Sequence, residues 1–150
     1  MKTWKEWDEP SGKVDKVGIT AGSFDLIHPG YIRLFADARN HCDYLIVALQ
    51  TDPTVDREWK NKPIQSLIDR QEILSAIKFI DEVRVYTTEE DLVRLLKEVK
   101  PDIRIIGSDH RGCGGFTGEE LDIPIHWHER SHPYSTSELR DRIVEAGYNG

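Results

Sequence analysis

The sequence predicts an α/β domain with a doubly wound parallel sheet of about five strands and helices on both of its faces. Segments with strand character alternate with segments of helical periodicity along almost the whole chain. The strand segments include continuous apolar runs, which are typical of strands buried on both faces. The chain has 150 residues, of which 38% are hydrophobic and 31% are charged, and this suits one folded domain. We expect residues 1–13 to form an N-terminal arm and residues 14–150 to form the domain.

Three elements are predicted in the N-terminal third of the chain. The apolar run KVGIT predicts a strand at 16–20. A helix is predicted from Tyr31 to Arg39, because apolar side chains recur there at intervals of three and four residues. The run YLIVALQ predicts a second strand, buried on both faces, at 44–50.

The middle of the chain predicts a helix followed by a strand. Ser66 and Asp69 have the spacing of an N-terminal capping pair, and an apolar stripe follows them as far as Ile80. The run EVRVY then predicts a strand at 82–86.

The remaining elements continue the alternation to the end of the chain. Thr88 caps a helix that Pro101 stops, because proline cannot continue a helix. Strands are predicted at 103–107 and 123–127, and a last helix is predicted from Ser135 to Gly147. Strands separated by helices of this length favour a Rossmann-like parallel sheet with right-handed crossovers.

Ligands of such sheets bind beyond the carboxyl ends of the strands, where the strand order reverses. The loop GSFD at 22–25 follows the first predicted strand, and GSDH at 107–110 follows the fourth. These two strands are neighbours at the reversal in the commonest doubly wound orders. We therefore expect both loops to border the site.

Composition excludes several classes of partner. A formal net charge of −7 argues against broad binding to nucleic acid or to an acidic membrane surface. No apolar run approaches the roughly 18 residues that a membrane-spanning helix needs. Cys42 and Cys113 do not form a Cys-x-x-Cys pair, so free thiols and a cytoplasmic location are expected.

The segment GSFDLIHPGY contains a histidine beside a proline and a glycine at a strand-to-helix turn. Pro29 and Gly30 suit a tight entry into a helix, and a helix N-terminus favours a phosphate. His28 would add a donor at that place. From these three residues alone, a turn with a surface histidine is the better interpretation.

The wider pattern changes this interpretation. GSFDLIHPG resembles the signature of the nucleotidyltransferase superfamily whose motif is His-x-Gly-His, and the chain looks cytidylyltransferase-like from about Lys16 to Ile143. It is similar to small cytidylyltransferases such as glycerol-3-phosphate cytidylyltransferase, and to the adenylyltransferase domain that makes ADP-heptose. The matching segments are GSFDLIHPG, TD at 51–52, KNK at 60–62, DR at 69–70, GSDH and RSHPYSTSELRDRI.

The resemblance implies transfer of CMP from CTP to a phosphorylated alcohol or sugar, with release of pyrophosphate. Mg²⁺ would bind with the nucleotide, and the protein would be a homodimer. The implied nucleotide contacts are Gly22, Ser23, Phe24, His28, Lys62, Asp109, Arg130, Ser135, Thr136 and Ser137. The implied catalytic residues are His28, Tyr31, Lys62 and Arg130, and those for the acceptor are Asp25, Lys60, Arg70 and Lys78.

The chain departs from the family pattern at Tyr31, where the family has its second histidine. Tyrosine cannot become cationic near pH 7, which leaves open a nucleotide-binding protein with weakened or lost catalysis. The segment from Thr87 to Gly107 looks more like the ADP-heptose enzymes, which leaves open an adenylyltransferase that uses ATP.

A zinc site formed by histidines is the last alternative. His126 and His128 would share one strand face, and His110, His132 and Cys113 could join them. No pair of these residues has the spacing of a known zinc site. The sequence therefore predicts no metal held by the protein itself.

Overall fold

The structure is a computed structural model, and it describes residues 15–111, 115–130 and 132–149. The five strands are β1 (Val17–Gly22), β2 (Tyr44–Gln50), β3 (Glu82–Tyr86), β4 (Ile103–Gly107) and β5 (Ile125–His128). The α-helices are α2 (Pro29–Arg39), α3 (Leu67–Ser75), α4 (Glu89–Val99) and α5 (Thr136–Asn149). Three short 3₁₀ helices are η1 (Pro53–Val55), η2 (Ser108–His110) and η3 (Glu119–Leu121). The predicted arm at 1–13 lies outside the described residues.

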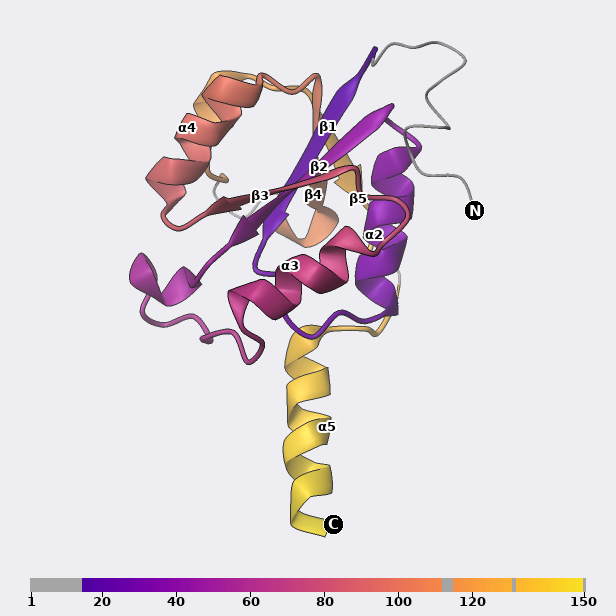
Figure 1. Ribbon diagram of the computed structural model, residues 1–150, viewed down its shortest axis with the longest axis vertical. Helices are drawn as coiled ribbons and strands as arrows, with labels where there is room; N and C mark the ends of the chain where they lie inside the picture. The colour runs from indigo at the N-terminus through magenta and orange to yellow at the C-terminus, as the bar shows by residue number, and fades with distance from the viewer. Residues whose placement is uncertain (1–14, 112–114, 131, 150) are drawn as a thin grey trace.

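All strand pairs are parallel, and the order in the sheet is β3-β2-β1-β4-β5 (Figure 1). This confirms the predicted Rossmann-like sheet. The chain builds outward from β1 to β3 and then crosses back to β4, so the order reverses between β1 and β4. The loops after these two strands therefore meet at one edge of the sheet, as predicted.

Two apolar layers cover the sheet. On one face, Phe35 of α2 and Leu74 of α3 pack with Leu45, Val47 and Leu49 of β2. On the other face, three leucines of α4 pack with Ile19 of β1 and Ile46 and Ala48 of β2: Leu92, Leu95 and Leu96. Full burial of one such side chain is worth about 1.5–3 kcal/mol. Strand β2 contributes to both layers, which explains its unbroken apolar sequence.

The predicted helix caps are confirmed. Ser66 Oγ accepts a hydrogen bond from the backbone N–H of Asp69 at the start of α3. Thr88 and Asp91 form a reciprocal capping box at the start of α4. Ser135 Oγ accepts from the backbone N–H of Glu138 at the start of α5. Each cap satisfies a backbone donor that has no partner within its helix.

Several predicted boundaries are wrong. Strand β1 spans Val17–Gly22 rather than 16–20, and α2 begins at Pro29 rather than Tyr31. The last strand begins at Ile125 rather than residue 123. Helix α3 ends at Ser75, and single turns then bring Ile80 into the core without a helix. Gly147 does not end α5, because a single glycine costs only about 1 kcal/mol in a helix and the helix continues to Asn149.

Helix α5 projects away from the sheet and its flanking helices (Figure 1). Its residues from 141 to 147 are exposed. Only its first turn therefore lies near the rest of the domain. No helix among the described residues is long and apolar enough to cross a membrane.

Candidate functional site

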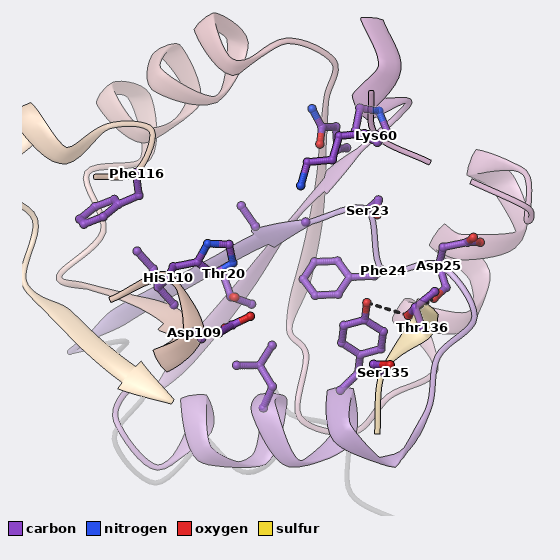
Figure 2. Close-up of a pocket in the computed structure, with 18 of the residues that line it drawn as sticks. Thr20, Ser23, Phe24, Asp25, Lys60, Asp109, His110, Phe116, Ser135 and Thr136 are labelled. Atoms are coloured by element: carbon purple, nitrogen blue, oxygen red, sulfur yellow. Dashed lines mark hydrogen bonds between the residues drawn. The ribbon is translucent and has the colours of Figure 1, made fainter. Parts of the chain in front are cut away.

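A cavity of about 590 Å³ opens at the carboxyl ends of the strands, where the order reverses. Figure 2 shows Ser23, Phe24, Asp109 and Thr136 around it. The predicted site residues that line it are Gly22, Ser23, Phe24, Asp25, His28, Tyr31, Lys60, Asp109, Arg130, Ser135, Thr136 and Ser137. Lys62, Arg70 and Lys78 are not part of the lining. The volume lies in the range of pockets for small molecules.

His28 is the N-cap of α2. Its Nδ1 accepts a hydrogen bond of 3.1 Å from the backbone N–H of Gly30, so the ring carries its proton on Nε2. Burial lowers the pKa of His28, and the nearby Arg130 and His132 lower it further. The imidazole is therefore a neutral donor near pH 7 rather than a cation.

Gly30 allows the rings of His28 and His132 to pack close to the backbone of α2. A Cβ atom at residue 30 would lie 2.5 Å from Cε1 of His132 and 2.8 Å from Cε1 of His28. Both distances are shorter than real Cβ contacts allow. The glycine of the HPG segment therefore serves close ring packing against the first turn of α2.

Tyr31 connects the start of α2 to the start of α5. Its ring stacks on His28 with a centroid distance of 4.2 Å. Its hydroxyl lies 3.0 Å from Thr136 Oγ1, and the Thr136 hydroxyl donates to the carbonyl of Asp25. Because Thr136 has one hydroxyl proton and gives it to Asp25, Tyr31 is the donor to Thr136. Burial raises the pKa of Tyr31, which keeps that proton in place.

The loop from Ser23 to Leu26 adopts a strained backbone. Phe24 has a φ of 46° and Leu26 has a φ of 52°, a region that favours glycine. The Asp25 carboxylate accepts hydrogen bonds from the backbone N–H groups of Ile64 and Gln65. These bonds fix the loop against the segment that precedes α3.

Asp25 and Arg70, which were predicted to contact the acceptor, are both engaged in contacts within the chain. Besides its two backbone donors, Asp25 forms an ion pair of 3.5 Å with Arg140. Arg70 is only 2% exposed. It donates to the backbone carbonyls of Ser23, Gln50, Thr51 and Gln65. Its guanidinium is thus used to hold the loop after β1 and is not presented to a ligand.

The predicted lysines differ in position. Lys60 lines the cavity, as the label in Figure 2 shows. The side chain of Lys62 is 80% exposed, and its Nζ lies 4.0 Å from Asp52 Oδ2 at the side of the cavity. Lys78 lies over the ring of Phe79 and outside the cavity, so its predicted role at the acceptor does not fit its position.

Arg130 and the start of α5 form one wall. A guanidinium nitrogen of Arg130 lies 3.4 Å from Asp109 Oδ2, and another donates to the carbonyl of Tyr134. Ser135, Thr136 and Ser137 follow at the start of α5 and line the cavity. A helix N-terminus with hydroxyl side chains favours an anion.

The opposite wall contains residues that the sequence analysis did not select. Arg104 on β4 is 6% exposed, donates to the carbonyl of Thr117 and lies over the ring of Phe116. Arg57 forms an ion pair of 3.1 Å with Glu89. A signal for Arg104 was present, because a charged residue stood inside the apolar run IRIIG.

His128 also lines the cavity, whereas the sequence analysis considered it only as a zinc ligand. It lies at the end of β5 and is 9% exposed. Its Nδ1 lies 2.8 Å from Asp37 Oδ2, whereas its Nε2 is buried and has no hydrogen-bond partner among the described residues. A buried ring nitrogen without a partner in a cavity wall suits contact with a ligand.

The charges of the cavity favour an anionic ligand. Asp25, Asp109 and Glu89 each form an ion pair with an arginine. Lys60 and the buried Arg104 have no carboxylate partner among the ion pairs of the described residues. The acidic residues of the lining are thus neutralised locally, although the whole chain has a net charge of −7.

Comparisons with known proteins identify the family of the chain. A family model described as cytidylyltransferase-like matches residues 19–142. The chain is 36% identical over 132 residues to the bifunctional protein HldE of Campylobacter curvus (strain 525.92), covering 87% of this chain and 28% of that protein. It is 40% identical over 97 residues to HldE of Gluconacetobacter diazotrophicus, covering 64% of this chain and 20% of that protein. The chain thus spans only a fifth to about a quarter of these curated relatives.

Solved structures share the fold. A lipopolysaccharide core biosynthesis protein from Thermoplasma volcanium GSS1 superposes with a TM-score of 0.64 at 25% identity, covering 82% of this chain and all of that one. Pantoate-beta-alanine ligase from Francisella tularensis, solved with beta-gamma ATP and beta-alanine, superposes with a TM-score of 0.59. It is 16% identical and covers 97% of this chain and 77% of that one, so it supports the fold alone.

Proposed function

The chain belongs to the cytidylyltransferase-like family, and we propose that it transfers CMP from CTP to a phosphorylated alcohol or sugar, with release of pyrophosphate. One observation carries the proposal. One cavity at the β1/β4 reversal is lined both by the N-terminal ends of α2 and α5 and by several arginines. Two anionic substrates could therefore meet in it.

The nucleotide would occupy the wall formed by α2 and α5. His28 offers its Nε2–H, and the start of α5 offers hydroxyl and backbone N–H groups to the β- and γ-phosphates. Asp109 and Arg130 would lie beside the base and ribose. Cytosine has an amino and a carbonyl edge that such polar groups can recognise, and this supports CTP as the donor.

The phosphorylated acceptor would occupy the wall formed by Arg57, Lys60 and Arg104. Lys60 keeps its predicted role at the acceptor, and Arg57 and Arg104 take the role predicted for Arg70 and Lys78. Arginine binds phosphate with two parallel N–H groups, and burial strengthens that interaction.

The reaction requires alignment rather than a general base. A phosphate monoester has a second pKa near 6, so its oxygen is already ionised near neutral pH. That oxygen forms a bond to the α-phosphorus of the nucleotide, and the bond between the α-phosphorus and the bridging oxygen of the β-phosphate breaks. His28, the start of α5 and Lys60 would hold the phosphates in line and stabilise charge on the departing pyrophosphate.

Mg²⁺ fits this site as part of the nucleotide complex. The described lining carboxylates Asp25, Asp109 and Glu89 are each engaged by an arginine, so the ion would take most of its oxygen ligands from phosphates and water. When bound, it would supply charge neutralisation on the phosphates.

Transfer of AMP from ATP is a second candidate. The curated relatives named above are HldE proteins, and the segment from Thr87 to Gly107 resembles the ADP-heptose enzymes rather than the glycerol-phosphate ones.

Pyrophosphate release would test these candidates directly. CTP and ATP are each offered with Mg²⁺ and a panel of phosphorylated alcohols and sugar phosphates. Release with CTP and one acceptor supports the proposal, and release with ATP alone supports the second candidate. If calorimetry detects nucleotide binding but no acceptor gives pyrophosphate, the chain is a nucleotide-binding protein without this activity.

We expect the protein to act as a homodimer in the cytoplasm, as the resemblance implies. The projecting α5 exposes Ile143 and Val144, which offer apolar surface to a second copy. Light scattering after size exclusion would measure the mass in solution. A monomer at micromolar concentration would remove the dimer from the proposal and leave the reaction unaffected.

A further inference from the structure

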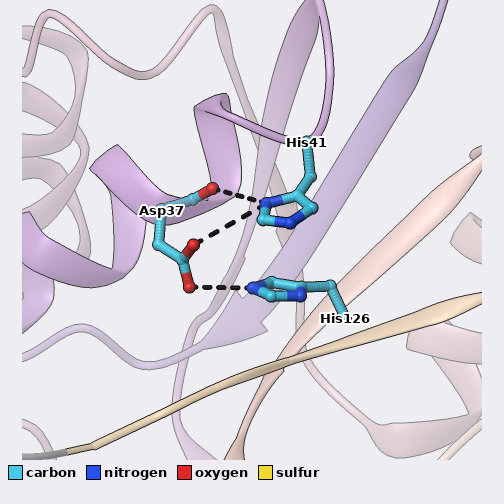
Figure 3. Close-up of side chains that lie close together, drawn as sticks. All are labelled: Asp37, His41 and His126. Atoms are coloured by element: carbon cyan, nitrogen blue, oxygen red, sulfur yellow. Dashed lines mark hydrogen bonds and ion pairs between the residues drawn. The ribbon is translucent and has the colours of Figure 1, made fainter.

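Three histidines lie around the carboxylate of Asp37: His41 after α2, and His126 and His128 on β5. Asp37 lies in the last turn of α2, and His41 follows that helix. Asp37 Oδ2 lies 2.9 Å from His126 Nε2 and 2.8 Å from His128 Nδ1. Its Oδ1 lies 3.7 Å from His41 Nδ1. Figure 3 shows the rings of His41 and His126 side by side, with their nitrogens facing the carboxylate.

Three of these residues have the geometry of a metal site. The donor atoms of Asp37, His41 and His126 all lie within 4.8 Å of one another. Zinc binds imidazole nitrogen and carboxylate oxygen at about 2.0–2.2 Å, so tetrahedral ligand atoms lie roughly 3.3–3.5 Å apart. The two rings are stacked with a centroid distance of 3.6 Å and an angle of 20°. Small rotations of these side chains would direct both nitrogens to one point.

We propose that Asp37, His41 and His126 bind a divalent transition-metal ion of the Zn²⁺ class. Two imidazoles and one carboxylate suit Zn²⁺, Co²⁺ or Ni²⁺, whereas Mg²⁺ prefers oxygen ligands alone. The three side chains are between 26% and 37% exposed, so the ion can enter from solvent and keep water at an open position. None of the three lines the nucleotide cavity, which separates this site from the Mg²⁺ of the proposed reaction.

Binding requires a proton to move at each histidine. His41 Nδ1 now donates to the backbone carbonyl of Asp37, and His126 Nε2 faces the carboxylate. In a neutral ring, the proton shifts to the other ring nitrogen and the vacated lone pair binds the ion. No bond to carbon is made or broken, and no electron is transferred.

The site would join two elements and support the cavity. Asp37 and His41 belong to the C-terminal end of α2, whereas His126 belongs to β5, so the ion would link the helix to the edge strand. Asp37 Oδ2 also holds His128, whose ring lines the cavity. An ion that fixes Asp37 would therefore also fix the orientation of His128.

Titration with Co²⁺ would test the proposal on the full chain after treatment with a chelator and in the absence of nucleotide. One equivalent should bind and give the visible absorption bands of a nitrogen- and oxygen-ligated ion, and Zn²⁺ should displace it. A hundredfold excess of Mg²⁺ should not. Displacement by Mg²⁺, or the absence of stoichiometric binding at micromolar concentration, overturns the site.

His41→Ala and His126→Gln should each weaken Co²⁺ binding by roughly tenfold or more, because loss of even an indirect partner of a metal commonly costs that much. His110→Gln is the matched control, because it removes a histidine from outside this cluster and should bind Co²⁺ like the wild type. Equal binding by all three variants contradicts the assignment. Zn²⁺ should raise the Tm of the wild type but not that of His41→Ala, a readout that is independent of activity.

Discussion

His28 combines a structural role with a position in the proposed site. Its Nδ1 caps α2, and this bond leaves the proton on Nε2, in a ring that lines the cavity. Because the cap requires a lone pair on Nδ1, protonation of the ring would remove it. The ring is therefore oriented as a neutral donor toward the cavity; the sequence predicted a donor here but neither the cap nor the tautomer.

Two substitutions at His28 should separate these roles. His28→Asn can keep the cap, because the amide oxygen can accept from the N–H of Gly30, so stability should change little. His28→Ala should lower the free energy of unfolding by about 1 kcal/mol. Both variants should lose turnover, measured by pyrophosphate release. Normal turnover by His28→Asn would show that the imidazole does not contact the phosphates.

Tyr31 occupies the place of the second motif histidine, yet its proton goes to Thr136. A neutral hydrogen bond is roughly half as strong as a charge-assisted one, so we expect slow turnover in the wild type. Tyr31→His should raise kcat with little change in nucleotide affinity. Tyr31→Phe loses the bond to Thr136 and should weaken nucleotide binding instead. Fast wild-type turnover that both variants slow would identify the tyrosine as an adapted donor.

Lys62 tests the basic segment beside the cavity. Lys62→Ala should lower kcat/KM by about tenfold or more while the Tm stays unchanged, because an exposed lysine contributes little to folding. Lys78→Ala is the control: it is also exposed, but it has no lining residue beside it, whereas Lys62 lies between the lining residues Asn61 and Pro63. A fall in Tm with normal activity per folded molecule would make Lys62 structural.

At the scale of elements, α3 holds the loop after β1 (Ser23 to Leu26) through Arg70. The guanidinium reaches the carbonyls of Ser23 after β1 and of Gln50 and Thr51 after β2. Helix α3 therefore fixes the ends of two neighbouring strands, and it does so with a residue that the motif alone would assign to a ligand.

Arg70→Met keeps most of the side-chain volume but leaves these buried carbonyls without their donor. It should lower the free energy of unfolding by about 3 kcal/mol or more, because hydrogen bonds to charged groups are worth about 1.5–3 kcal/mol each. Glu72→Ala, on an exposed position of the same helix, should stay within about 0.5 kcal/mol of the wild type. Urea denaturation measures both. An unchanged midpoint for Arg70→Met would contradict the structural role.

At the scale of the whole molecule, folding should respond to pH through His28. Its pKa lies below 6.5 in the folded state, where it faces Arg130, His132 and Tyr31, and near 6.5 in the unfolded state. The unfolded chain therefore binds more protons as the pH falls through 6.5, so stability should decrease in that range and stay level above it. Denaturation at pH 7.5, 6.5 and 5.5 should show a smaller loss for His28→Asn. An equal loss in both proteins would assign the effect to other groups.

The parallel sheet was predictable because its signals are local. The apolar runs at 44–50 and 82–86 became β2 and β3 with the predicted bounds, and the capping residues Ser66, Thr88 and Ser135 began their helices as predicted. Errors arose where distant packing decides an element, as at Ile80, which reaches the core from a turn.

The site was predictable in part. Most of the motif residues line one cavity, because a parallel sheet brings the ends of its strands to the same edge. Their roles were less predictable. Arg70 carries the positive charge that a phosphate site needs, and Asp25 belongs to the same motif set, but both side chains hold the loop after β1. Such roles depend on burial and on hydrogen-bond partners, and both are set by residues far away in the sequence.

The sequence by itself determined the fold class, the strand and helix pattern and the family motif, because periodicity, caps and short motifs depend on neighbouring residues. The tertiary structure alone decided that Arg57 and Arg104 line the same cavity as the start of α5, that Tyr31 donates to Thr136, and that His41, His126 and His128 lie around Asp37. Asp37 is 89 positions from His126, so only the packing of α2 against β5 brings them together. Such pairs cannot be recognised from neighbouring residues, because they are far apart in the sequence and meet only in the folded chain.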